Sequence, residues 1–261
     1  MKLFPQNAVI KYKNAEKYQI GNVGYNASGL IQIDVDWLCG SIEIVTAAES
    51  NGQFASSEIL IEENGTAALS EAKKLRTLFE NGVLKIRFCE SGYKGNVSHG
   101  EKKLKITLIA VKTLSEININ SASAPILLSE LSVQKVKIKT ASGSAKIENC
   151  TMQNLSVKTA SGTAHISNAS GSTADIETAS GNVEIFGFAL SNTRIQTASG
   201  NIDLELGNTE QPQNGARVTF VTASGKLNAK SNYILENGAY LYGNGARSIG
   251  IETASGSLTV N

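Results

Sequence analysis

A four-residue phrase, Thr-Ala-Ser-Gly, recurs at a fixed interval and limits what this chain can fold into. Four copies follow one another at 19-residue steps, starting at Thr140, Thr159, Thr178 and Thr197. A degenerate copy, Ser-Ala-Ser-Ala, begins one step earlier at Ser121. Two later copies, at Thr222 and Thr253, follow at longer intervals, as expected for the same unit carrying a short insertion and then a longer one. A period of about 20 residues is typical of stacked supersecondary units, so we expect a repeat protein.

Aligning the repeats produces columns of apolar residues. One column holds Ile119, Ile138, Val157, Ile176 and Ile195. Another holds Leu128, Ile147, Ile166, Ile185 and Leu204. Within one repeat the apolar positions alternate with polar ones, which is the pattern of a β-strand. Each repeat therefore predicts two short strands, one before and one after the Thr-Ala-Ser-Gly corner.

Stacking of equivalent strands predicts an all-β fold, a parallel β-solenoid (single-stranded β-helix) with rungs of about 19 residues. We expect the corner glycine to adopt a backbone conformation closed to other residues. The corner Ser and Thr hydroxyls are expected to bond to backbone groups of their own or the neighbouring corner. A looser column that includes Leu131 and Cys150 predicts a third, less regular side to each rung.

Two regions are predicted along the chain. Residues 1–101 are expected to form a β-rich N-terminal capping region, and residues 102–261 the solenoid. In the first region we expect strands at 30–38, 40–45, 58–62 and 83–88 and a short helix over 70–79. The insertion around 232–247 is expected to fold over the last rungs. Because the chain stops soon after Leu258-Thr-Val, we expect that final edge to be weakly protected and able to pair with a second copy.

Composition argues against nucleic-acid binding and membrane insertion. Lys and Arg number 24 and Asp and Glu 23, so net charge does not point to nucleic acid, and no apolar run is long enough to insert in a membrane. The three cysteines, Cys39, Cys89 and Cys150, favour reduced thiols over a disulfide framework. Since the N-terminus also shows no signal-peptide pattern, a cytoplasmic location is favoured.

The Thr-Ala-Ser-Gly rungs carry a family resemblance from roughly residue 30 to the end. Together with Lys103-Leu-Lys-Ile-Thr-Leu and with Ile33-Asp-Val-Asp-Trp-Leu-Cys-Gly-Ser-Ile-Glu-Ile, they resemble a bacterial β-strand-repeat family of unknown function labelled "putative adhesin". The resemblance implies the scaffold and no catalytic or binding residues. It also admits a location at the cell surface, where many relatives are exported or anchored.

Several sets of side chains can be interpreted either as a functional site or as part of the scaffold. The repeated Thr residues form either an outward ladder that binds ice or glycan, or a set of hydrogen bonds within the corners. Their positions alternate in step with the inward isoleucine columns, which favours the hydrogen bonds within the corners. Outward carboxylates form either a glycosidase pair or ordinary cross-strand ion pairs such as Lys158 with Glu177 and His165 with Glu184. They are Asp175, Glu177, Glu184, Asp203 and Glu205.

Elsewhere the residue patterns are weaker. Asp34 and Asp36 beside Trp37 are too few ligands for a metal subsite, and a solvent-facing edge is the favoured interpretation. His99 and His165 have no ligand partners nearby in sequence, and no phosphate loop or nucleophile elbow is present. We therefore assign no catalytic, cofactor-binding or metal-binding residue.

Function is expected to be non-enzymatic: an adhesion, interaction or scaffolding module for an unknown protein or glycan partner. The alternatives are a carbohydrate-active enzyme on the outer face and an end-to-end assembling structural protein, associating weakly through its terminal rungs.

Overall fold

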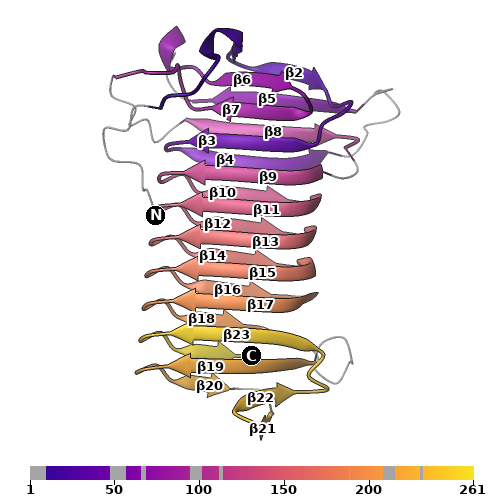
Figure 1. The fold of residues 1–261 in the computed structure, drawn as a ribbon, viewed down its shortest axis with the longest axis vertical. Coiled ribbons are helices and arrows are strands. Elements are labelled where there is room, and N and C mark those ends of the chain that lie inside the picture. The colour runs from indigo at the N-terminus through magenta and orange to yellow at the C-terminus, as the bar shows by residue number, and fades with distance from the viewer. Residues whose placement is uncertain are drawn as a thin grey trace.

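A computed structural model describes residues 10–47, 57–65, 69–94, 102–111, 114–187, 189–207, 215–229 and 232–261. Its strands form two long sheets stacked along one axis (Figure 1). In spatial order the first sheet contains β1 (Gln19–Ile20), β6 (Arg76–Glu80), β7 (Val83–Arg87), β3 (Gln32–Trp37), β9 (Leu114–Ser121), β11 (Ser132–Thr140), β13 (Thr151–Thr159), β15 (Ser170–Thr178), β17 (Ala189–Thr197), β23 (Arg247–Thr253), β19 (Ala216–Thr222), β22 (Ala239–Tyr242) and β21 (Ile234–Glu236). The second contains β2 (Val23–Asn26), β5 (Glu58–Asn64), β8 (Lys103–Ile109), β4 (Ser41–Ala47), β10 (Ile126–Ser129), β12 (Ala145–Glu148), β14 (Ala164–Ser167), β16 (Val183–Phe186), β18 (Ile202–Leu204), β24 (Leu258–Val260) and β20 (Leu227–Ala229). The all-β architecture with parallel stacking is as predicted.

Each rung pairs one strand of the first sheet with one of the second, joined at the Thr-Ala-Ser-Gly corner. Val136 lies beside Leu155 and Ile147 beside Ile166, so partners in adjacent strands are separated by one full repeat. Both sheets are parallel along the body of the stack. The repeat period of the sequence is therefore the strand register of the fold.

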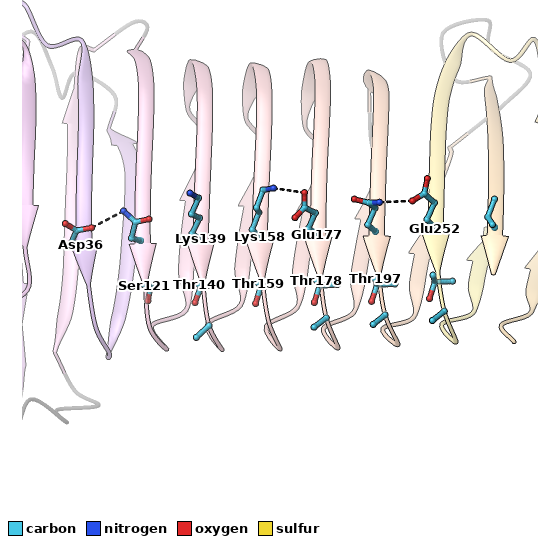
Figure 2. Close-up of a pocket in the computed structure, with 18 residues that line it drawn as sticks. Asp36, Ser121, Lys139, Thr140, Lys158, Thr159, Glu177, Thr178, Thr197 and Glu252 are labelled. Atoms are coloured by element: carbon cyan, nitrogen blue, oxygen red, sulfur yellow. Dashed lines mark hydrogen bonds and ion pairs between the residues drawn. The ribbon is translucent and has the colours of Figure 1, made fainter. Parts of the chain in front are cut away.

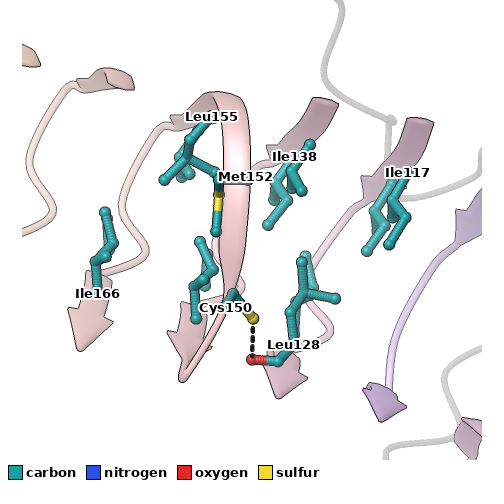
Figure 3. Packing of buried hydrophobic residues seen from close by; sticks show 14 of the residues in the cluster. Ile117, Leu128, Ile138, Cys150, Met152, Leu155 and Ile166 are labelled. Carbon is teal, nitrogen blue, oxygen red and sulfur yellow. Dashed lines mark hydrogen bonds between the residues drawn. The ribbon is translucent and has the colours of Figure 1, made fainter. Parts of the chain in front are cut away.

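The core lies between the two sheets and is made of the predicted columns. Ile138, Ile147 and Ile166 have no measurable exposure, and neighbouring rungs place equivalent residues directly above and below them (Figure 3). Thr140 is also fully buried, in line with the isoleucine column, so the corner threonines face inward as parity predicted. A single rung buries little by itself, so the stack is stabilised by contact between rungs.

The corner hydroxyls make the hydrogen bonds that the sequence predicted. The Gly181 N–H donates to Thr178 Oγ1 at 2.8 Å, and the same bond recurs at the other Thr-Ala-Ser-Gly corners. At the degenerate corner the Ala124 N–H donates to Ser121 Oγ at 3.0 Å. Ser255 Oγ donates to the Ala198 carbonyl of the adjacent rung at 3.4 Å. These bonds satisfy backbone groups that the turn would otherwise leave unpaired.

Replacing Thr178 by valine is expected to destabilise the protein by about 1–2 kcal/mol, because the buried Gly181 N–H loses its acceptor while the shape is kept. Thr178→Ser retains the hydroxyl, as Ser121 does naturally, and should recover most of that loss. Urea midpoints of the two variants provide the measurement. Equal midpoints for valine and wild type would show that the hydrogen bond contributes nothing.

The prediction about the corner glycines was wrong in its reason. Gly143, Gly162, Gly181 and their equivalents do not have positive φ; instead, a Cβ on Gly162 would lie 1.9 Å from the Gly143 carbonyl oxygen. Glycine is required because the backbones of successive rungs nearly touch there. Positive φ occurs at the opposite corner, where Asn149 and Asn168 have φ of 53° and 50°.

A third side to each rung, predicted from the Leu131 and Cys150 column, is not observed. Residues after the second corner continue directly into a nine-residue strand such as β11 or β13. Gln134 is skipped in the pairing, and the buried positions change parity there, from Val133 to Val136. Each described rung therefore has two sides, one of them bent. Cys150 is buried at the second corner, where its thiol donates to the Glu148 carbonyl at 3.1 Å and contacts that of Leu128 (Figure 3).

The order of rungs in space departs from the order in the chain at both ends. Near the N-terminus, β3 and β4 lie between the β7–β8 rung and the β9–β10 rung, although they precede all four in the chain. The expected strands at 30–38 and 40–45 are therefore confirmed, and they lie in opposite sheets. The sequence also predicts that residues 104–111 and 117–119 form the two halves of one rung, and this prediction was wrong. They lie in different rungs, because the rung of β3 and β4 stands between β9 and β8.

At the C-terminal end the last strands, β23 and β24, are inserted between the β17–β18 and β19–β20 rungs. Leu258 and Val260 have no measurable exposure, so the expectation of an open edge there was wrong. The physical reason is burial on both sides. Insertion covers Ile249, Ile251, Leu258 and Val260 by a rung above and a rung below, whereas the outermost rung leaves Phe220, Leu227 and Ala229 half-buried.

The chain reaches the inserted position by crossing the end of β19. β22 and β23 are consecutive in the chain but flank β19 on opposite sides. Gly215 allows the crossing, because a Cβ there would lie 2.1 Å from Asn244 Oδ1. Arg247 is buried beside it and donates to the carbonyls of Gly215 and Leu206, at 3.3 and 3.1 Å. Burial lowers the pKa of its guanidinium.

The strand pair β21–β22 covers the outer edge of β19, as expected for the insertion around 232–247 (Figure 1). It also carries Ile234 and Leu235, which are 69% and 65% exposed. Association of copies through the terminal rungs stays a prediction. The exposed apolar surface available for such an association is the strand pair β21–β22.

The N-terminal region contains antiparallel strands at the end of the stack, with β1 on β6 and β2 on β5. The strands expected at 58–62 and 83–88 are confirmed as β5 and β7. The helix expected over 70–79 is replaced by a short 3-10 turn (Glu71–Lys73) and then β6; a second such turn covers Ala15–Lys17. Leu75 and Thr77 are buried because β6 pairs with β7, which overrides helical spacing.

The division at residue 101 stays a prediction, although both sheets run across it without a break. Among the described residues, no helix is long and apolar enough to span a membrane.

Candidate binding groove

A groove of about 1230 Å³ runs along the first sheet beside the Thr-Ala-Ser-Gly corners (Figure 2). Side chains from β3, β9, β11, β13, β15, β17, β19 and β23 line it, so it crosses the strands and follows the axis of the stack. Since neighbouring strands lie about 4.8 Å apart, one set of groove residues recurs at that spacing.

The floor of the groove is small and rigid. It contains the corner threonines, whose Oγ1 atoms already accept hydrogen bonds, and alanines that follow them in the corner, including Ala141, Ala179 and Ala198. Ala179 and Ala198 are exposed, whereas the threonines are nearly buried. The floor therefore offers van der Waals contact along the groove and little free hydrogen-bonding capacity.

One wall is a row of outward side chains that we call the polar row, one from each lining strand except β19, which carries Val221 at the equivalent position. The polar row consists of Asp36, Asn120, Lys139, Lys158, Glu177, Gln196 and Glu252. Each immediately precedes the inward Thr, Ser or Trp position, so strand alternation turns it to solvent.

Members of the polar row form three pairs and leave one residue over. Asn120 Nδ2 donates to Asp36 Oδ1 at 2.9 Å, Lys158 Nζ to Glu177 Oε1 at 2.5 Å, and Gln196 Nε2 to Glu252 Oε2 at 2.7 Å. Lys139 lies between the first two pairs, exposed and without an ion pair to any residue in the described parts of the chain (Figure 2).

Lysines concentrate around this position. β11 carries Lys135, Lys137 and Lys139 on its outward face. Lys137 contacts Glu116 at 2.8 Å; its hydrogen bond lowers the pKa of the Glu116 carboxyl, and Glu116 raises the pKa of Lys137. Lys135 is exposed like Lys139. The groove near β11 is thus basic, while the far end carries Glu252.

The carboxylates predicted as a glycosidase pair are divided between the two sheets. Asp175 and Glu177 lie on β15, and Glu184 and Asp203 lie on the opposite face in β16 and β18. Each of three has a partner: Lys158 for Glu177, His165 at 3.0 Å for Glu184, and Asn261 at 2.7 Å for Asp203. The two cross-strand pairs expected from the sequence are observed, and of the five carboxylates, which include Glu205, only Glu177 lines the groove.

Asp34 and Asp36 do not lie on a solvent-facing edge, because β3 is flanked by β7 and β9. Arg87, nearly buried on β7, contacts Asp34 Oδ2 at 2.6 Å and Asp36 Oδ2 at 3.2 Å. The two carboxylates raise the pKa of Arg87 against the opposing effect of burial. The pair is therefore part of an ion-pair network. His99 lies outside the described residues. No group of three or more candidate metal ligands occurs among the residues that the structure describes.

Sequence reasoning missed a buried lysine. Lys102 Nζ contacts Glu63 Oε1 at 2.7 Å, donates to the carbonyls of Lys73 and Phe88, and lies over the Trp37 and Phe88 rings. Burial lowers the pKa of Lys102. These residues come from segments far apart in the chain, so no local pattern could have shown the cluster. The Lys102 ammonium is held by one carboxylate and two carbonyls, which indicates a structural role at the N-terminal end.

A family model described as Toastrack DUF4097 matches residues 53–261. The chain belongs to the Toastrack family. The resemblance stated from its corners is thereby confirmed. No curated protein matches this Toastrack chain.

Solved structures similar to the Toastrack chain come from bacteria. A "putative adhesin" from Bacteroides fragilis NCTC 9343 is 12% identical, with 93% of this chain and 97% of that chain covered and a TM-score of 0.46. One from Parabacteroides merdae ATCC 43184 is 14% identical, with 97% and 98% covered and a TM-score of 0.44. A "putative lipid binding protein" from Parabacteroides distasonis ATCC 8503 is 16% identical, with 92% and 96% covered and a TM-score of 0.41.

Proposed function

We propose that this protein is a non-enzymatic interaction module that binds a linear polysaccharide along the groove. The N-terminal antiparallel strands act as its cap, and the 19-residue rungs space the ligand-binding side chains evenly along the groove. Two of the similar bacterial structures are named "putative adhesin", which describes those proteins; the support for this chain comes from its groove.

The observation that carries the proposal is the polar row. It presents one hydrogen-bonding or charged side chain per rung beside a smooth floor, over a length of several rungs. The spacing of about 4.8 Å is close to the length of one hexose unit in an extended β-linked chain. A polypeptide strand advances about 3.3 Å per residue and would fall out of step with the row. Successive sugars can therefore repeat the same contacts on successive rungs.

The engagement of the groove carboxylates supports a non-enzymatic role. Glycoside cleavage needs an acid and a base or nucleophile held on either side of one bond. In the groove, Asp36 contacts Arg87 and Asn120, Glu177 contacts Lys158, and Glu252 contacts Gln196. All three belong to the same wall, so they face a bound chain from one side.

Blocking the groove is expected to abolish glycan binding. Ala179→Trp places a large ring on the exposed floor, and Ser180→Trp, at the next corner residue outside the groove lining, is the matched control. Affinity electrophoresis in gels containing neutral and acidic linear glycans measures the effect. We expect retardation of wild type and Ser180→Trp and a loss of at least tenfold in affinity for Ala179→Trp. Equal binding by both tryptophan variants would contradict the groove as the site, and no retardation of wild type by any linear glycan would overturn the proposed function.

A further inference from the structure

We infer that Lys139 anchors an anionic group of the bound polymer, so that the groove selects a linear acidic glycan whose charges are spaced apart. This inference rests on the proposed function and names the class of glycan. The shared chemistry is a carboxylate or a sulfate ester on a sugar unit.

Pairing within the polar row leaves Lys139 without a partner among the described residues. The polar row uses its members in neighbouring pairs, and Lys139 is the member left without an opposite charge or amide in the described parts of the row. Its ammonium stands exposed between Asn120 and Lys158 (Figure 2). Asn120 donates its amide N–H to Asp36, so its Oδ1 atom remains available to accept from a ligand hydroxyl.

The charge around Lys139 is positive. Lys135 and Lys137 share the strand with Lys139, and Lys158 lies beside it on β13. On β11 and the two strands that flank it, these four cations face one carboxylate, Glu116, which Lys137 already holds. The local excess of positive charge attracts an anion to this rung.

The other end of the groove carries an exposed carboxylate. Glu252 lies four rungs away from Lys139, bonded to Gln196 and 3.8 Å from Arg194, and its carboxylate is exposed. With one sugar per rung, a polymer charged on every unit or on every second unit would bring anions against Glu177 and Glu252, which lie two and four rungs from Lys139. A glycan whose acidic units are more than four sugars apart can place an anion at Lys139 and hydroxyls along Glu177, Gln196 and Glu252.

The small floor supports the same class. Threonine and alanine side chains give the ligand shallow contact, so affinity has to come from hydrogen bonds and ion pairs with the polar row. A single exposed ion pair contributes little to binding, so the expected effect of one lysine is a modest and measurable change in affinity.

The test measures binding of an otherwise neutral β-linked oligosaccharide that carries a single uronate, by isothermal titration at low salt. We expect Lys139→Gln to weaken binding about three- to fivefold. Lys139→Arg should restore it. Lys135→Gln, a matched loss of charge on the same strand outside the groove lining, should change it by less than twofold. The carboxyl-reduced form of this oligosaccharide should bind wild type as weakly as the uronate form binds Lys139→Gln.

The outcomes separate the two proposals. Equal affinity of wild type for the uronate oligosaccharide and its carboxyl-reduced form, with binding of both abolished by Ala179→Trp, would overturn the role of Lys139 and leave the groove as a glycan site. Tighter binding of the same oligosaccharide carrying a single sulfate ester than of the neutral form, with the difference lost in Lys139→Gln, would identify sulfate as the anion. Tighter binding of poly-glutamate than of either glycan would overturn the inference in favour of an acidic polypeptide. Failure of every glycan to bind would remove the proposed function itself.

Discussion

Leu258→Lys is expected to unfold the C-terminal rungs, at a cost of about 5 kcal/mol, because it removes a buried leucine and leaves an uncompensated charge in the core. Leu258 has no measurable exposure and lies between β18 and β20. Hydrogen exchange provides the measurement, because rungs in a repeat protein can open locally. We expect amides of β17–β20, β23 and β24 to lose protection while β11–β15 keep theirs.

Thr259→Lys is the matched control, since Thr259 is the next residue on the same strand and turns outward, beside Asp203. It should leave protection unchanged. If Leu258 instead formed an open edge, both lysines would be tolerated and Leu258→Lys would only reduce association of copies. Equal protection in the two variants would therefore contradict the inserted position of β24.

Gly162→Ala is expected to destabilise the protein by about 3 kcal/mol or more, because the added methyl group overpacks a contact between backbones. The added Cβ would lie 1.9 Å from the Gly143 carbonyl oxygen and 2.6 Å from its carbon, and neither atom can move without separating two rungs. Because these rungs are in the middle of the stack, the loss should spread to both sides. The urea midpoint and the exchange of β11–β14 amides report it.

Gly250→Ala is the same substitution in a different setting. Its Cβ would meet Thr219 Oγ1 at 3.6 Å, which is ordinary contact, and the backbone needs no positive φ. We expect stability equal to wild type or slightly higher, because alanine restricts the unfolded chain. A Gly162→Ala midpoint equal to that of Gly250→Ala would show that the rungs are not as close as the corner contact requires.

The candidate site was only partly predictable. Alternation showed that Lys139, Lys158 and Glu177 face solvent and that Lys158 lies over Glu177. It could not show a groove, because that depends on how the wall and the corner are angled. Nor could it show that Asp36 and Glu252, from opposite ends of the chain, share one row.

What the sequence determined by itself is the rung. The 19-residue period, the apolar columns and the Thr-Ala-Ser-Gly corner are local, and each repeat states them again, so they predict parallel stacking without reference to distant residues. The sequence also predicted that the corner hydroxyls bond to backbone groups, and the structure identifies the glycine N–H of the same corner as the donor to threonine Oγ1.

Only the tertiary structure decided the order of the rungs at the ends. All Thr-Ala-Ser-Gly rungs share one register, so β19 or β23 would fit against β17 equally well as far as local pairing is concerned. In the structure the rung with Ile249, Ile251, Leu258 and Val260 lies inside, buried from both sides, and the β19–β20 rung is left at the end, partly covered by β22. That arrangement involves the whole end of the molecule, which no single repeat of the sequence contains.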